Sequence, residues 1–153
     1  MMIHAYDRNL LHKAQVTLAW MFEYGVNEYG IDIADFYQWF ISSKIAYRFA
    51  MGDVSIVAGC AGGELAYKVV QFAYPDVDFV GQIYRMDRSP EYWVGYVLAY
   101  YQWERGFSFE EISQAVRIED IKGMYSKYHE MDISQFVIEM DRLMDANCEK
   151  LST

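Results

Sequence analysis

The stretch SPEYWVGYVLAYYQWERGFSFEEI, residues 89–112, decides the fold class. Ser89 is a favourable N-cap, and Pro90 suits the first position of a helix because its missing N–H would have no partner there. From Pro90 onward, large side chains occupy every side of the helix, which is typical of a helix buried at the centre of a domain. We therefore predict a central, aromatic-rich helix at about 90–105, where Gly95 lets a neighbouring helix approach closely. Its aromatic side chains are Tyr92, Trp93, Tyr96, Tyr100, Tyr101 and Trp103.

Helix-start signals also mark the rest of the C-terminal half. Ser108 and Glu111 have the spacing of a capping box, in which each side chain bonds the backbone N–H of the other residue. Short helices are predicted at about 109–116 and 118–125, and Asp132 caps the last helix. A long helix followed by two short ones resembles the layout of a helix-turn-helix.

The N-terminal half has comparable boundaries. Asp7 can cap a first helix that runs to about Tyr24, because apolar residues recur there at steps of three and four. A second helical region opens at Asp32, can split at Ser42–Ser43, and ends near Gly52, which is a favourable residue after a helix.

The segment between these halves predicts shorter elements. Residues 54–59 favour a helical turn over a short strand, and Glu64 to Tyr74 form a helix that Pro75 stops. Residues 77–88 alternate loosely and are expected to form an irregular connector on the core. The sum is a single all-α domain over residues 1–153, a compact bundle of six to eight helices.

Composition limits the classes of partner. The 153 residues are 54% hydrophobic, which excludes a disordered chain, and carry 22 acidic and 13 basic residues for a net charge of −9. From Ser89 to the end, 12 acidic and 6 basic residues leave −6 on the helix-turn-helix-like half. Such a field opposes phosphate backbones and anionic lipids. We expect no nucleic acid and no membrane partner.

Catalytic and metal-binding patterns are weak. Cys60 and Cys148 form no CxxC pair, and the three histidines are scattered, so no metal or cofactor is expected. Adjacent residues such as those of Tyr128-His129-Glu130 do not face each other on a helix, which predicts a protein that is not an enzyme. The N-terminus lacks a secretory pattern, and no apolar run reaches the ~18 residues of a membrane span, so a cytoplasmic location is expected.

The aromatic residues allow three uses: core, a pocket for a planar ligand, or an exposed partner face. The core use is favoured for most of them. Tyr92 and Trp103, near the ends of the central helix, and Tyr125 and Tyr128 are expected to be partly exposed. Together with Glu110 they are the candidate partner-binding residues, because tyrosine and tryptophan dominate interface hot spots.

Four segments carry a family resemblance. They are residues 89–112, MYSKYHEMDISQFVIEMDRLM (124–144), AYDRNLLHKAQVTLAWMFEYGVN (5–27) and VAGCAGGELAYKVV (57–70). Together they resemble a family of small uncharacterised proteins of gut Firmicutes. The genes of that family often lie in short operons with toxin-like genes, some of which resemble ADP-ribosyltransferases. The resemblance implies an interaction protein and assigns no functional residue.

Taken together, the pattern and the resemblance predict a protein-binding, antitoxin-like or regulatory protein that sequesters a partner encoded nearby, with a toxin as one candidate. Two alternatives stay open. One is a nucleotide or small planar-ligand binding protein that uses an aromatic pocket. The other is a degenerate helix-turn-helix regulator. The partner's identity and the oligomeric state do not follow from the sequence.

Overall fold

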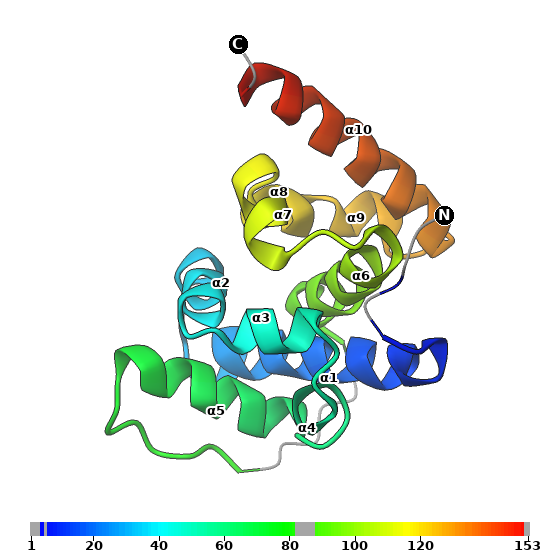
Figure 1. Ribbon diagram of the computed structural model, residues 1–153. Coiled ribbons are helices and arrows are strands. Elements are labelled where there is room, and N and C mark those ends of the chain that lie inside the picture. Colours follow the sequence, from blue (N-terminus) through cyan, green and yellow to red (C-terminus); the bar gives the residue numbers. More distant parts are fainter. Residues whose placement is uncertain (1–3, 5, 82–87, 152–153) are drawn as a thin grey trace.

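A computed structural model describes residue 4 and residues 6–81 and 88–151, with side chains as far as residue 147 (Figure 1). Within these ranges the chain is all-helical and contains no strand, which confirms the predicted fold class. The described residues form ten α-helices, more than the six to eight predicted, because several of them are single turns.

The N-terminal half builds one layer of the bundle. A short 3-10 turn, Arg8–Leu10, precedes the first helix, and the Asp7 carboxylate caps this turn by accepting from the Asn9 N–H at 2.8 Å. A π-helical turn, Tyr24–Glu28, extends the first helix at its C-terminal end. The helices are α1 (Leu11–Glu23), α2 (Ile33–Ser42), α3 (Ile45–Ala50), α4 (Val54–Val57) and α5 (Gly62–Ala73).

Two predicted boundaries in this half are confirmed. Asp32 caps α2 through the Ala34 N–H, and the second helical region splits just after Ser42. Lys44 adopts a left-handed conformation at the split, with φ of 71°, and this turn redirects the chain into α3. Gly52 follows α3 with φ of 74°, as a glycine after a helix commonly does.

Helix α6 (Pro90–Arg105) is the predicted aromatic helix, and it lies between α1 and the C-terminal helices (Figure 1). The Ser89 hydroxyl accepts from the Tyr92 N–H at 3.2 Å, and Gly106 ends the helix with φ of 76°. A Cβ placed on Gly95 would lie 2.4 Å from the Leu18 carbonyl oxygen of α1. The backbones of α1 and α6 therefore touch at Gly95, as the sequence predicts.

The C-terminal half continues as α7 (Phe109–Ala115), α8 (Ile118–Gly123), α9 (Tyr125–Tyr128) and α10 (Ile133–Leu151). The capping box is present: Ser108 Oγ accepts from the Glu111 N–H, and Glu111 Oε1 accepts from the Ser108 N–H, both at 3.0 Å. Asp132 Oδ1 accepts from the Ser134 N–H at 2.9 Å, which confirms the start of α10.

A polar network ties α10 to α6. Arg105 donates from Nε and Nη2 to the Asp141 carboxylate at 3.0 and 2.8 Å, and the Tyr101 hydroxyl donates to Asp141 at 2.8 Å. Arg105 lowers the pKa of the Asp141 carboxyl below its usual value. The long last helix is therefore held by a charge-assisted network in addition to its apolar face.

The buried apolar side chains of the described residues form one contiguous core. Phe40, Phe49 and Phe109 meet edge to face there, with ring centroids 5.2 to 6.4 Å apart, and join α2, α3 and α7. The predicted connector has no regular structure at 77–81, where the Val80 N–H donates to the Tyr29 hydroxyl at 3.0 Å. Residues 82–87 of that prediction lie outside the described residues.

Candidate functional site

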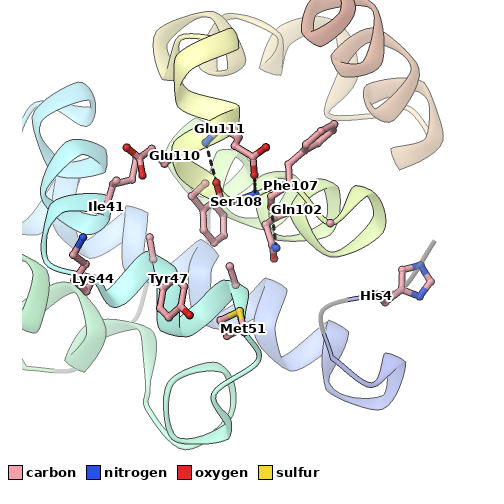
Figure 2. Close-up of a pocket in the computed structure, with 14 residues that line it drawn as sticks. His4, Ile41, Lys44, Tyr47, Met51, Gln102, Phe107, Ser108, Glu110 and Glu111 are labelled. Atoms are coloured by element: carbon pink, nitrogen blue, oxygen red, sulfur yellow. Dashed lines mark hydrogen bonds between the residues drawn. The ribbon is translucent and has the colours of Figure 1, made fainter. Parts of the chain in front are cut away.

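A groove with a volume of about 440 Å³ lies between α3 and the corner that joins α6 to α7. Figure 2 shows α3 on one side of it and the α6–α7 corner on the other. We call it the α3–α7 groove. The side chains that matter for its chemistry are Tyr47, Met51, Gln102, Phe107, Glu110 and Glu111.

The apolar wall of the α3–α7 groove comes from α3. This short helix buries Ile45 and Phe49 in the core, so that residues on its other side face solvent. Tyr47 on α3 and Met51, the residue that directly follows this helix, are 64% and 62% exposed. Large apolar side chains that stay exposed beside a cavity mark interaction sites more often than scattered single ones do.

The polar wall comes from the first turn of α7. Gly106 turns the chain out of α6, and the capping box then starts α7 so that Glu110 and Glu111 lie at its N-terminus. The helix dipole favours carboxylates at this position. Glu110 is exposed, whereas the Glu111 carboxylate is fixed by its bond to the Ser108 N–H. The groove therefore places two carboxylates opposite two apolar side chains, and Lys44 and His4 also belong to its lining.

Gln102 closes the α6 side of the groove. Its side chain is only 2% exposed, and its Nε2 donates to the Phe107 carbonyl oxygen at 3.0 Å. Among the described residues, its Oε1 has no hydrogen-bond partner. An unpaired buried acceptor costs about 1–3 kcal/mol, so a donor that reached this oxygen on binding would remove that penalty.

A second, smaller concavity of about 290 Å³ lies between the first turns of α6 and α9. Tyr92, Trp93 and Tyr96 form its α6 wall, and Tyr125 and His129 form the opposite wall. The rings of Trp93 and Tyr125 meet edge to face at 5.8 Å, and those of Tyr125 and His129 stack at 4.2 Å. We call this the aromatic pocket.

The five residues singled out from the sequence do not form one surface. Glu110 lies in the α3–α7 groove, whereas Tyr92 and Tyr125 both line the aromatic pocket. Tyr128 is half-buried and lies beside the Lys127 ammonium, which is 5.2 Å from its ring centroid. Trp103 lines neither concavity.

The expectation that Tyr92 and Trp103 are partly exposed is wrong. Trp103 is 1% exposed because the N-terminal segment covers it: the His4 ring stacks on it at 3.7 Å, and its indole N–H donates to the Tyr6 carbonyl oxygen at 2.8 Å. Tyr92 is 5% exposed, and its ring meets that of Trp20 edge to face, with centroids 5.2 Å apart. Both rings therefore belong to the core.

Sequence reasoning missed Tyr47, Met51 and Gln102. The one usable signal in the sequence was the four-residue spacing of Tyr47 and Met51, which lie opposite the buried face of α3. That signal is weak, because an apolar residue on each side of a six-residue helix also fits a fully buried helix. Gln102 gave no signal, because an isolated glutamine on a helix reveals nothing of its burial.

The Tyr128-His129-Glu130 segment is not assembled for catalysis. His129 Nδ1 donates to the Tyr125 carbonyl oxygen at 2.6 Å, which fixes the ring against the backbone. Its Nε2 lies 3.6 Å from Glu130 Oε1 at the surface. Burial raises the pKa of the Cys60 thiol, which disfavours a reactive thiolate there.

Metal-ligand groupings and membrane spans are both missing from the described part of the chain. No three His, Cys, Asp or Glu side chains gather there as a metal site requires. No helix in that part is long and apolar enough to cross a membrane.

Comparisons with protein-family models, with curated proteins and with solved structures returned no match.

Proposed function

We propose that the protein acts by binding another protein, and that the α3–α7 groove is the docking site for a segment of that partner. The observation that carries the proposal is the pair of exposed side chains, Tyr47 and Met51, beside a cavity whose other wall bears Glu110 and Glu111. An apolar anchor beside an acidic wall suits a segment that carries both apolar and basic side chains.

The magnitudes are sufficient for a specific contact. Covering Tyr47 and Met51, which are each more than 60% exposed, contributes about 2–4 kcal/mol from apolar burial. The net charge of −9 attracts a basic partner over a longer range and speeds encounter. Because rim charges act mainly on association and buried anchors mainly on dissociation, the two walls should affect binding kinetics differently.

The family resemblance suggests which protein the partner is. Genes of the similar family often lie beside toxin-like genes, so we propose an antitoxin-like or regulatory role in which this chain sequesters the product of an adjacent gene. The acidic surface supports this proposal, since a basic cleft is a complementary target. The absence of a metal-binding group among the described residues is compatible with a binding role but does not argue for it.

The test is co-expression with the adjacent gene, followed by affinity purification and a growth assay. We expect the two proteins to co-purify and growth inhibition by the partner to be relieved. Replacing Tyr47 or Met51 with Ala should weaken binding by about 2 kcal/mol or roughly 30-fold at a true hot spot, with the helical circular dichroism unchanged. Phe72, which is 51% exposed on α5 and lies outside the groove, is the matched control for substitution with Ala.

The acidic wall has its own test. Glu110→Lys should slow association, and this effect should shrink as the salt concentration rises. The proposal fails if the adjacent product binds and the Tyr47, Met51 and Glu110 variants all match the Phe72→Ala control. An adjacent product that neither binds nor inhibits growth would refute the antitoxin-like role itself.

A further inference from the structure

The aromatic pocket has the dimensions of a small-molecule site. Its volume of about 290 Å³ is just below the range for ligand pockets, about 300–1,000 Å³. A space of this size holds a single planar ring system more readily than a peptide segment. The pocket is formed by α6 and α9, and no residue of the α3–α7 groove lines it.

The walls of the pocket suit a flat ring. Trp93 and Tyr96 project from neighbouring turns of α6 and are half-buried, so part of each ring borders the cavity. Tyr125 stands opposite, fixed in place by the edge-to-face contact with Trp93 and by the stacked His129 ring. Rings that are already fixed lose little conformational entropy when a ligand stacks on them.

The charge of the pocket departs from that of the whole chain. Arg88 and His129 are the basic residues of its lining, and the lining that the structure describes holds no carboxylate, although the chain carries −9. Two carboxylates contact lining residues from outside the pocket: Glu23 accepts from the Ser89 hydroxyl, and Glu130 lies beside His129. His129 Nε2 lies 3.6 Å from the Glu130 carboxylate, and Arg88 is the group of the lining that is always charged. The Arg88 guanidinium lies 4.9 Å from the centroid of the Tyr92 ring, at the wall of the pocket.

We propose that the aromatic pocket binds a planar heteroaromatic ring that carries an anionic group, as a nucleoside monophosphate does. The ring stacks among Trp93, Tyr96 and Tyr125, and the anion pairs with Arg88. Stacking accepts any base because every base has a π-face, so the pocket selects for a flat ring and a negative charge and discriminates weakly between bases. This site is separate from the docking groove and does not depend on the proposed protein partner.

The experiment compares three probes by thermal shift and calorimetry on the full chain: adenosine monophosphate, adenosine, and ribose 5-phosphate. We expect the nucleotide to raise the Tm in a concentration-dependent way, adenosine to bind about tenfold more weakly, and ribose 5-phosphate to give no shift. Equal shifts for the nucleotide and ribose 5-phosphate would show a charge-only site and overturn the proposal, and so would no shift with the nucleotide at millimolar concentration.

Variants locate the binding. Tyr96→Ala should weaken nucleotide binding at least about tenfold, a factor within the range of one lost stacking contact. Tyr100→Ala is its matched control, because Tyr100 is also half-buried on α6, one turn further on, and does not line the pocket. Nucleotide binding that the two variants reduce equally would place the ligand elsewhere and refute the proposal.

Arg88→Gln tests the anion contact. This variant should bind the nucleotide about tenfold more weakly and bind adenosine with unchanged affinity. The control is Arg117→Gln, which removes a surface arginine paired with Glu119 and should change neither affinity. Loss of adenosine binding in Arg88→Gln would mean that the arginine acts through the shape of the pocket, and the assignment of an anion contact would be wrong. A protein partner that still binds the Tyr96→Ala variant would confirm that the two sites are distinct.

Discussion

Replacing Gly95 with Ala should separate the two central helices. The added Cβ would lie 2.4 Å from the Leu18 carbonyl oxygen and 2.7 Å from the Ala19 Cα, whereas ordinary contacts begin near 3.4 Å. Both obstacles are backbone atoms, so α1 and α6 must move apart by about 1 Å at this point. A gap of that size forfeits a quarter to a half of each dispersion contact across it. We expect a net loss of about 1–3 kcal/mol, after allowing for the better helix propensity of alanine.

Urea unfolding followed by circular dichroism measures the free energy, and thermal melts give a second readout. For a chain of this size the loss corresponds to a Tm lowered by about 3–10 °C. Gly123→Ala is the matched control: it also replaces a helical glycine, but a Cβ there would meet nothing within 4 Å, so it should be neutral or stabilising by up to about 1 kcal/mol. If Gly95→Ala is as stable as Gly123→Ala, the close approach of α1 and α6 is wrong.

Three further changes test local features. Asp141→Asn should lower the free energy of unfolding by about 1–2 kcal/mol at neutral pH. Because Arg105 lowers the pKa of this carboxyl in the folded state, its stabilisation is present above about pH 4 and is lost as the pH falls through the folded pKa. Urea titrations at several pH values should therefore show a weaker acid dependence of stability in the variant than in the wild type. Ser108→Ala should remove the side-chain cap of α7 and cost about 1 kcal/mol, with Ser108→Thr retaining most of it, by the same unfolding assay. Lys44→Gly should raise stability by about 0.5–1 kcal/mol in thermal melts, because it relieves a left-handed backbone, whereas Lys44→Ala, which keeps the strain, should not.

Local signals were sufficient for the helix boundaries. Ser89-Pro90, the Ser108–Glu111 pair and Asp32 each act within one turn of chain, so their chemistry can be recognised without knowing what packs nearby. The close helix contact at Gly95 was also predicted correctly, since a glycine inside an otherwise bulky helix has few roles besides allowing a neighbouring helix to approach. The single-turn helices α4 and α9 were harder, because so few residues carry little periodicity.

Exposure could not be predicted in the same way. Trp103 is buried by His4 and Tyr6, which lie about a hundred residues earlier in the chain, and no local pattern reports such a covering segment. The α3–α7 groove could not be predicted for the same reason, because its lining comes from His4 and from residues within 41–51 and 102–111, which meet only when the helices pack. Sites of this kind depend on how helices cross, which a single sequence does not specify.

The contact of α1 with α6 has a consequence for synthesis on the ribosome. Leu18 and Gly95 are 77 residues apart, and closing a loop of that length costs about 4 kcal/mol of chain entropy. At about 5–20 residues per second, α6 is completed roughly 4–16 s after α1. Once α5 has been made, it can cover α1 through its contact at Gly62, but until α6 follows, the side of α1 that faces α6 stays open to water, chaperones and other nascent chains. The order in which helices leave the ribosome thus leaves the α6-facing side of the first helix dependent on protection during translation.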